Sequence, residues 1–305
     1  MNTPNSQSSV GVIGLGAMGN GMAQSVRRAG YSPFVFDVRA EAAQAFAKDG
    51  GTACASLADL GKNCDVVVSV VVNAAQTESV LFGDSGQGGC AASMKPGSVF
   101  VMCSTVDPNW SVALETRLAA LGILYIDAPI SGGAAKAASG QMTMMTAGKP
   151  AAYTIAEPIL NAMAAKVYKL GDSAGAGSKV KIINQLLAGV HIAAAAEAMA
   201  LGLREGVDPD ALYEVITNSA GNSWMFENRM AHVLAADYTP LSAVDIFVKD
   251  LGIVLDMARA TKFPLPLSST AHQMFMQAST AGFAKEDDSA VIKIFPGIEL
   301  PKKKS

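Results

Sequence analysis

Short runs of apolar residues alternate with longer helical patterns in the first half of the chain. The runs lie within SVGVIG (9–14), PFVFD (33–37), DVVVSVVV (65–72), GSVFVMCST (97–105), ILYIDAP (123–129) and QMTMMTAG (141–148). Continuous apolar runs bounded by turn residues are typical of strands that are buried on both faces of a parallel sheet. Because helical segments separate these runs, the pattern predicts an α/β fold built on a doubly wound parallel sheet.

The second half of the chain has a different pattern. Helical periodicity dominates from about residue 175 to residue 295, and no segment there predicts a strand. The stretch from about Ser178 to Glu205 predicts one long helix of about 40 Å, at ~1.5 Å per residue. A length of 305 residues also suggests two domains. We therefore predict a sheet domain over 1–173 and an all-α domain over 174–305, joined by the long helix, which would form a wall of the cleft between them.

Composition narrows the class of protein. Hydrophobic residues make up 50% of the chain and charged residues 16%, which indicates a well-packed soluble protein and excludes a disordered one. The net charge of −3 gives no electrostatic reason to expect a nucleic-acid partner. The stretch Leu186–Leu203 is long enough to span a membrane. It is mostly alanine and contains His191 and Glu197, so we expect a helix buried between other helices and no membrane partner.

Cysteine and histidine usage predicts neither disulfides nor a metal site. No pair of cysteines has CxxC spacing, and the histidines lie far apart. The first ten residues also lack the basic and apolar regions of a signal peptide. These features predict reduced thiols, no metal and a cytoplasmic location. The residues concerned are Cys54, Cys64, Cys90, Cys103, His191, His232 and His272.

Three glycines between the first strand and the following helix carry the strongest chemical signal. Gly14, Gly16 and Gly19 have G-x-G-x-x-G spacing inside a strand–helix–strand unit. The first glycine permits a tight turn, the second lets the backbone approach a pyrophosphate, and the third lets helix and strand pack closely. The helix N-terminus then presents free N–H groups to the phosphates. This pattern predicts a bound dinucleotide, against the alternative of a glycine-rich turn without a ligand.

Asp37 ends the second strand, at the position where a carboxylate accepts hydrogen bonds from the adenosine ribose hydroxyls. A carboxylate there repels the 2′-phosphate of NADP, so Asp37 favours NAD. Arg39 weakens this preference, because an arginine can pair with that phosphate.

Two polar segments follow later strands of the first half. Ser104 and Thr105 lie where a cofactor contact is expected, although they could instead cap the helix that follows Asp107. In the loop after the next strand, the N–H groups of Ser131, Gly132 and Gly133 could form a nest for a carboxylate. The same loop residues are also ordinary turn formers, and the sequence leaves both readings open.

Lys181, Asn184 and Gln185 share one face of the long helix, since they are related by i, i+3 and i+4. Lys179 lies about 200° round the helix from Lys181. The helix N-terminus and partial burial would both lower the pKa of the Lys181 ammonium. A lysine with a lowered pKa can exchange a proton near neutral pH, as the oxidation of an alcohol requires. The alternative is that both lysines are solvated.

Three further segments of the second half have simpler interpretations. In NSWMFENR (222–229), Asn222 or Ser223 is expected to cap a helix whose aromatic residues lie in the core. In FVKDL (247–251), Lys249 and Asp250 predict a surface ion pair. The segment KEDDSAVIKIF (285–295) predicts a capped amphipathic helix.

Several motifs in order resemble the β-hydroxyacid dehydrogenases, a family that includes 3-hydroxyisobutyrate dehydrogenase and tartronate semialdehyde reductase. They are GVIGLGAMG, CST (103–105), DAPISGG (127–133), GAGSKVKIINQ (175–185) and FVKDL, and they extend over almost the whole chain. The resemblance implies a Rossmann domain, an all-helical C-terminal domain and a cleft between them.

The resemblance also implies residue roles. Lys181 would be the catalytic acid/base. The substrate would be bound by Ser131, Gly132, Gly133, Asn184 and Gln185. The cofactor NAD would be bound by Gly14, Gly16, Met18, Gly19, Asp37, Thr105 and Lys249. Many family members have asparagine where this chain has Gln185, and the extra methylene suggests a longer or differently bound substrate.

Within the family, four segments are similar to members that oxidise a four-carbon sugar acid to its 2-dehydro form. They are QLLAGVHIAAAAEAMAL, NSWMFENRM, YTPLSAVDIFVKDLGIV and KEDDSAVIKIFPGIELP. A polyhydroxylated acid also suits the polar set of Asn184, Gln185, Asn222 and Ser223. The alternatives are a tartronate semialdehyde (2-hydroxy-3-oxopropionate) reductase, a 3-hydroxyisobutyrate dehydrogenase and a non-catalytic interaction module of the same fold. The apolar second half suggests a homo-oligomer.

Overall fold

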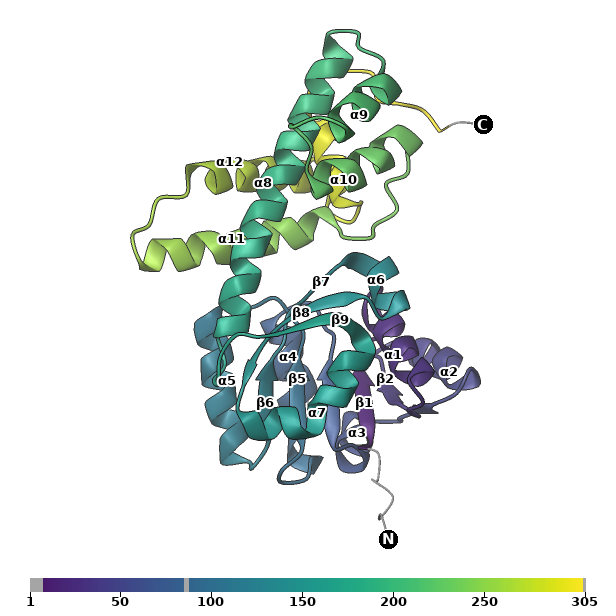
Figure 1. Cartoon of the computed structure of the whole chain (residues 1–305), viewed down its shortest axis with the longest axis vertical. Helices are drawn as coiled ribbons and strands as arrows, with labels where there is room; N and C mark the ends of the chain where they lie inside the picture. The colour runs from purple at the N-terminus through teal and green to yellow at the C-terminus, as the bar shows by residue number, and fades with distance from the viewer. Residues whose placement is uncertain (1–7, 85–87, 304–305) are drawn as a thin grey trace. The chain divides into compact units, whose positions relative to one another are not determined.

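The computed structural model describes residues 8–84 and 88–303 and divides into two compact units, Met1–Lys181 and Ile182–Ser305 (Figure 1). The predicted domain boundary after residue 173 lies a few residues before the long helix. Part of the N-terminal segment without signal-peptide features, residues 1–7, lies outside the described residues.

The first unit is built on a largely parallel sheet. Its first six strands have the order β3-β2-β1-β4-β5-β6, all parallel, which is the order of dinucleotide-binding doubly wound folds. They are β1 (Val10–Ile13), β2 (Phe34–Phe36), β3 (Thr52–Ala53), β4 (Val66–Ser69), β5 (Val99–Met102) and β6 (Leu124–Asp127). The α/β fold predicted from the apolar runs is therefore confirmed.

Helices cover both faces of this sheet, because alternate strand residues point to opposite sides and both sides are buried. Val66 and Val68 pack into one core cluster, while Val67 between them packs into another. The first cluster includes residues of α1 (Gly19–Arg28), α2 (Ala40–Lys48) and α7 (Pro150–Met163). The second includes residues of α3 (Leu57–Asn63), α4 (Ala74–Phe82), η1 (Ala91–Ser93) and α5 (Pro108–Ala120).

The far edge of the sheet departs from the parallel pattern. Strand β8 (Met142–Gly148) pairs antiparallel with β6 and with β7 (Ile130–Ser131), and parallel with β9 (Ala164–Lys169). The sequence did not predict β3, β7 or β9. Two of these are only two residues long, and β9 is a largely exposed strand that lacks a buried apolar run.

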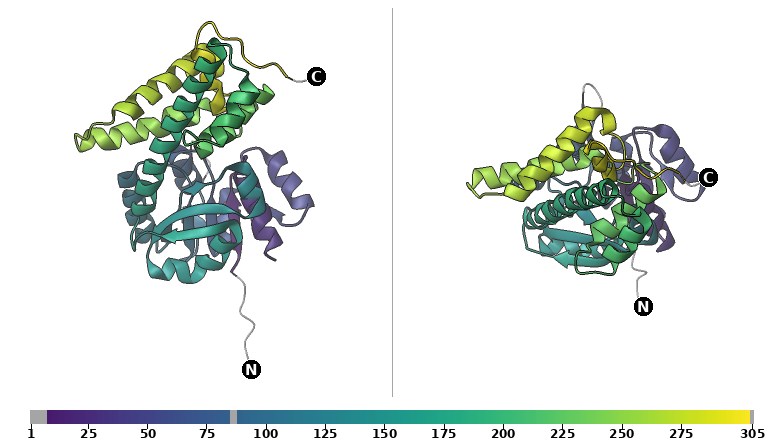
Figure 2. Two further views of the ribbon diagram at one scale, coloured as in Figure 1. Left: turned by 45° about the horizontal axis from the view of Figure 1, so that its top comes forward. Right: turned by 90° about the horizontal axis from the view of Figure 1, so that it is seen from above.

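The described part of the second unit is helical, as predicted. Its helices are α8 (Ala176–Arg204, which begins in the first unit), α9 (Pro209–Thr217), α10 (Trp224–Ala235), α11 (Val244–Ala260) and α12 (Pro266–Ala278), followed by η2 (Ser279–Phe283) and η3 (Asp288–Ile294). Helices α11 and α12 form an antiparallel pair (Figure 2) whose Phe247 and Phe275 rings stack at 5.1 Å between centroids.

The segment 285–295 differs from its prediction. It forms the 3-10 helix η3, capped by Asp287, in place of an amphipathic α-helix. Ala290, Val291 and Ile292 are all fully buried, so the segment buries successive residues and not one face.

Helix α8 has the length and apolar composition of a membrane-spanning helix, and 44% of its apolar window is buried. Ile183 and Leu187 are 55% and 51% exposed, whereas Ile192 and Ala196 are fully buried. The prediction of a helix buried between other helices therefore holds for one face.

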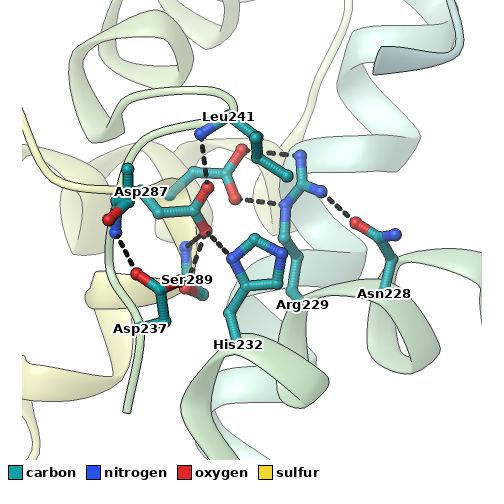
Figure 3. Close-up of polar contacts among 9 residues, drawn as sticks. Asn228, Arg229, His232, Asp237, Leu241, Asp287 and Ser289 are labelled. Atoms are coloured by element: carbon teal, nitrogen blue, oxygen red, sulfur yellow. Dashed lines mark hydrogen bonds and ion pairs between the residues drawn. The ribbon is translucent and has the colours of Figure 1, made fainter. Parts of the chain in front are cut away.

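A buried polar network holds α10 against η3 (Figure 3). The Arg229 guanidinium donates to both carboxylate oxygens of Asp288, with 3.1 Å between Nη2 and Oδ2. The neighbouring Asp287 carboxylate accepts from the N–H and hydroxyl of Ser289 and lies 3.4 Å from Nδ1 of His232. Burial raises the pKa of Asp288 to about 6 even though Arg229 opposes the shift, so desolvation outweighs the attraction of the pair.

We expect Asp288→Asn to lower the free energy of unfolding by about 3–5 kcal/mol, because it leaves the Arg229 charge buried without its partner. Replacing both residues, with Arg229→Met and Asp288→Leu, is expected to recover most of this loss, since the desolvation cost of both charges disappears. Urea unfolding followed by circular dichroism measures both. A double variant as unstable as Asp288→Asn would show that the pair contributes more than its desolvation costs.

Candidate active site

Four adjacent strands end in one row, at the edge of the sheet from which the predicted site residues emerge. Ile13 pairs with Ser69, Ser69 with Met102, and Met102 with Asp127. The row runs from β1 to β6 across three strand spacings, or about 14 Å at ~4.8 Å each. The chain order reverses between β1 and β4, so this is the switch point at which such sheets bind ligands.

Each of the three motif glycines is required by a different feature of the local geometry. Gly14 has a φ of +88°, and a Cβ there would lie 2.7 Å from the carbonyl oxygen of Val70. A Cβ on Gly19 would lie only 1.8 Å from the carbonyl oxygen of Gly14, so the helix packs directly on the turn. A Cβ on Gly16 would meet nothing within 4 Å. Gly16 therefore has no packing reason to be glycine, which fits a backbone that a ligand approaches.

The N-terminus of α1 is open to an anion. Met18 occupies its N-cap position without a side-chain hydrogen bond, and its first turn contains no acidic residue. No N-cap side chain or first-turn carboxylate therefore competes with a ligand for the N–H groups of this turn, although the N–H of Asn20 donates to the carbonyl oxygen of Gly16 at 3.1 Å. Together with Gly16, this arrangement fits the pyrophosphate of a dinucleotide.

Asp37 is held beside the glycine turn. Its Oδ2 accepts from the N–H of Leu15 at 2.7 Å, and its Oδ1 accepts from the N–H and Nε of Arg39 at 2.8 and 3.2 Å. Burial pushes the pKa of Asp37 upward, but the hydrogen bonds from Arg39 and Leu15 outweigh it and leave the pKa below its ordinary value. Asp37 is therefore a fixed carboxylate, and the Arg39 guanidinium is engaged with it.

The polar residues that follow β5 have different structural roles. The Ser104 hydroxyl is buried and donates to the carbonyl oxygen of Val71 at 2.7 Å, so it ties two loops together. The helix α5 is capped by Asp107, whose carboxylate accepts from the N–H of Asn109. The alternative of a Ser104 or Thr105 cap is therefore wrong. Thr105 remains at the carboxyl edge as the candidate cofactor contact.

Gly132 follows β7 as the N-cap of the short helix α6 (Gly133–Ser139), and Gly133 is the first residue of that helix. Their φ angles are +137° and +78°, which favour glycine. A Cβ on Gly133 would meet nothing within 4 Å. With Ser131, these residues present backbone at the same edge of the sheet as the glycine turn.

The two lysines at the start of α8 have opposite environments. Lys181 is buried, with 7% of its surface exposed, and Lys179 is exposed. The N-terminal turn of the helix, and with it Lys181, belongs to the first unit. The expectation that Lys181 is not a solvated surface lysine is confirmed by its burial.

Farther along α8, Gln185 is held by a carboxylate that the sequence did not single out. The Gln185 amide donates to Oδ2 of Asp250 at 2.6 Å and accepts from the Asn184 amide at 3.0 Å. Lys249 Nζ lies 2.6 Å from the other Asp250 oxygen. The predicted ion pair of Lys249 and Asp250 is therefore present, but its predicted surface location is wrong, since Asp250 is only 1% exposed and also holds Gln185. The sequence feature that could have predicted this burial is the position of Asp250 in FVKDL, inside an apolar helix pattern.

The segment 222–229 is predicted to cap a helix and to place its aromatic residues in the core. Ser223 caps α10 by accepting from the N–H of Phe226, as expected. Phe226 is buried, but Trp224 is 52% exposed and is not part of the core. Among the described residues, no His, Cys, Asp and Glu group is arranged to hold a metal.

Comparison with known proteins decides the family. Residues 9–171 match the NAD-binding domain of 6-phosphogluconate dehydrogenase, and residues 175–295 match the NAD-binding domain of NADP-dependent 3-hydroxyisobutyrate dehydrogenase. The chain belongs to the 3-hydroxyisobutyrate dehydrogenase-like family of β-hydroxyacid dehydrogenases.

Its relatives within this family cover nearly its whole length. It is 69% identical over 294 residues to the L-threonate dehydrogenase of Cupriavidus necator, covering 96% of this chain and 98% of that protein. It is 52% identical over 297 residues to the Escherichia coli L-threonate dehydrogenase, covering 97% of each. A Salmonella typhimurium crystal structure described as 3-hydroxyisobutyrate dehydrogenase has a TM-score of 0.90 at 54% identity and covers 95% of this chain and 100% of that one.

This β-hydroxyacid dehydrogenase is thus an enzyme that interconverts a hydroxy acid and the corresponding oxo acid with a nicotinamide dinucleotide. The features at the glycine turn fit that cofactor independently of the comparison. The alternative of a non-catalytic interaction module is not supported. The chain has the lysine and the glycine turn, and the family models match residues 9–171 and 175–295.

Proposed function

We propose that this enzyme oxidises L-threonate to its 2-dehydro form with NAD, using Lys181 as the general base. The observation that carries the proposal is the burial of Lys181, one turn into α8, at the carboxyl edge of a dinucleotide-binding sheet. A lysine is seldom buried unless its ammonium is paired, and buried ionisable groups are characteristic of active sites. The L-threonate dehydrogenase names of full-length relatives support the substrate.

Different residues of the chain would bind the substrate and transfer the proton. The N–H groups of Ser131, Gly132 and Gly133 bind the substrate carboxylate. Lys181 accepts the proton of the substrate hydroxyl as the carbonyl forms. A bound dinucleotide would supply the acceptor for the hydride of the same carbon.

Side chains that follow Lys181 on α8 would hydrogen-bond to the substrate hydroxyls. Asn184 shares its helix face and hydrogen-bonds Gln185, while Asp250 holds Gln185 in place. An amide fixed by two partners discriminates between substrates better than a mobile one. A polyhydroxylated acid therefore suits this set better than 3-hydroxyisobutyrate, which carries a methyl group.

The geometry at Asp37 supports NAD over NADP. Its carboxylate is fixed by three hydrogen bonds, and it would repel a 2′-phosphate while accepting from ribose hydroxyls. Arg39 is already paired with Asp37 through its Nε at 3.2 Å. Thr105 and Lys249 are the further proposed cofactor contacts.

The test is a substrate and cofactor panel followed by the absorbance of the reduced nicotinamide. L-threonate, D-threonate, both erythronates, glycerate and 3-hydroxyisobutyrate are each assayed with NAD and with NADP. We expect the highest kcat/KM with L-threonate and NAD. Highest activity with glycerate would favour tartronate semialdehyde reductase, and highest activity with 3-hydroxyisobutyrate would favour that dehydrogenase.

We also propose a cytoplasmic homo-oligomer. The proposal is supported by an exposed apolar stripe on α8, formed by Val180, Ile183, Leu187 and Leu201. Exposed apolar residues grouped on one helix face are typical of a subunit contact. A monomer by sedimentation velocity at micromolar concentration would contradict it.

A further inference from the structure

Asp127 is a fully buried carboxylate that lies outside every site role considered above. It is the last residue of β6, in the same row as Ile13, Ser69 and Met102. Its Oδ2 accepts from the N–H groups of Gly175 and Ser178, each at 2.9 Å. Its Oδ1 accepts from the Ser178 hydroxyl at 2.6 Å. All three donors belong to the turn that starts α8.

This carboxylate supplies what the helix lacks in its own sequence. The first turn of α8 contains no acidic residue, although a helix of 29 residues has unpaired N–H groups and a positive dipole end there. Asp127, at the end of strand β6, accepts from these N–H groups and places a carboxylate at the positive end of the dipole. The junction is also tight, because a Cβ on Gly177 would lie 2.3 Å from the carbonyl oxygen of Met145 and 2.9 Å from that of Asp127.

Burial disfavours the charged form of Asp127. Burial raises the pKa of Asp127, and the hydrogen bonds from Ser178 and Gly175 do not cancel the shift. A folded-state pKa above the unfolded value means that the contribution of this group to stability is lost as pH rises through the folded-state pKa.

We propose that Asp127 is a positioning residue of the dehydrogenase, which sets Lys181 in its reactive place by fixing the first turn of α8 to the carboxyl end of β6. Ser178, which makes two of the three hydrogen bonds, lies one helical turn before Lys181. The three bonds fix both the direction and the rotation of that turn, and so the side on which Lys181 leaves the helix. This inference rests on the proposed role of Lys181.

The test uses Asp127→Asn, with Glu115→Gln as the matched control. An amide can accept at only one of its two ends, so Asp127→Asn breaks the pattern of three donors. Glu115 accepts from the N–H of Ala174 at 3.1 Å, at the same junction but before the helix begins. We expect Asp127→Asn to lower kcat by about 10–100-fold, as a displacement of roughly 1 Å does. Glu115→Gln is expected to keep kcat within about twofold, and both variants to keep the wild-type Kd for NAD.

The same substitution in a Lys181→Ala background separates positioning from general damage. If Asp127 acts through Lys181, Asp127→Asn leaves the residual rate of Lys181→Ala unchanged. An equal fold-loss in both backgrounds would overturn the proposal, and so would a wild-type kcat for Asp127→Asn. Should Asp127→Asn fail to fold, Ser178→Ala removes the 2.6 Å hydrogen bond and keeps the carboxylate. A wild-type kcat for Ser178→Ala would then overturn the proposal. Full activity of Lys181→Ala alone would instead disprove the assigned base.

Discussion

Replacing Lys181 by alanine is expected to lower kcat for the sugar acid by about 10²–10⁴-fold, the range that a positioned acid or base contributes. The loss follows because the substrate hydroxyl would have no group to accept its proton. The Kd for NAD is expected to stay near the wild-type value, since the glycine turn and Asp37 are unaltered. Single-turnover kinetics and fluorescence titration with NADH measure the two quantities.

Lys179→Ala is the matched control. It removes the same charge from the same helix, two residues away, at an exposed position. We expect its kcat to stay within about twofold of wild type. Equal losses in the two variants would mean that the positive charge of the segment matters and the position of Lys181 does not.

Alanine at Gly16 and alanine at Gly19 are expected to impair the enzyme in different ways. Gly19→Ala places a methyl group 1.8 Å from the Gly14 carbonyl oxygen, so the turn must shift. It is expected to lower the free energy of unfolding by about 1–3 kcal/mol through overpacking and to weaken NAD binding as well. Gly16→Ala meets no protein atom within 4 Å, so the fold should be unchanged. Its methyl group would instead occupy space that the pyrophosphate needs, and we expect at least about tenfold weaker NAD binding.

Thermal unfolding and NADH titration of both variants, each measured without and with the cofactor, distinguish the two effects. Wild-type affinity in Gly16→Ala would place the pyrophosphate elsewhere. A Gly19→Ala protein with wild-type stability would show that the turn accommodates the methyl group by a small shift.

Features that depend on neighbours along the chain could be predicted from the sequence. Continuous apolar runs predicted β1, β4, β5, β6 and β8, because a strand buried on both faces leaves no polar alternation. The glycine spacing predicted the turn at Gly14 and the close packing at Gly19, since both are set within one strand–helix unit. The i, i+3, i+4 relation placed Lys181 and Gln185 on one face, and both are buried.

Features that depend on residues distant in sequence were decided only by the tertiary structure. The edge strand β9 is held by its pairing with β8, and it has no apolar run of its own. Asp250 is a surface charge by its local pattern, but the packing of α11 against α8 buries it beside Gln185. Asp127 ends a predicted strand, and only the return of the chain at Gly175 brings the start of α8 to its carboxylate. Periodicity along one segment carries no information on which distant backbone N–H groups will need an acceptor. The N–H groups at the start of α8 need one, and Asp127 supplies it.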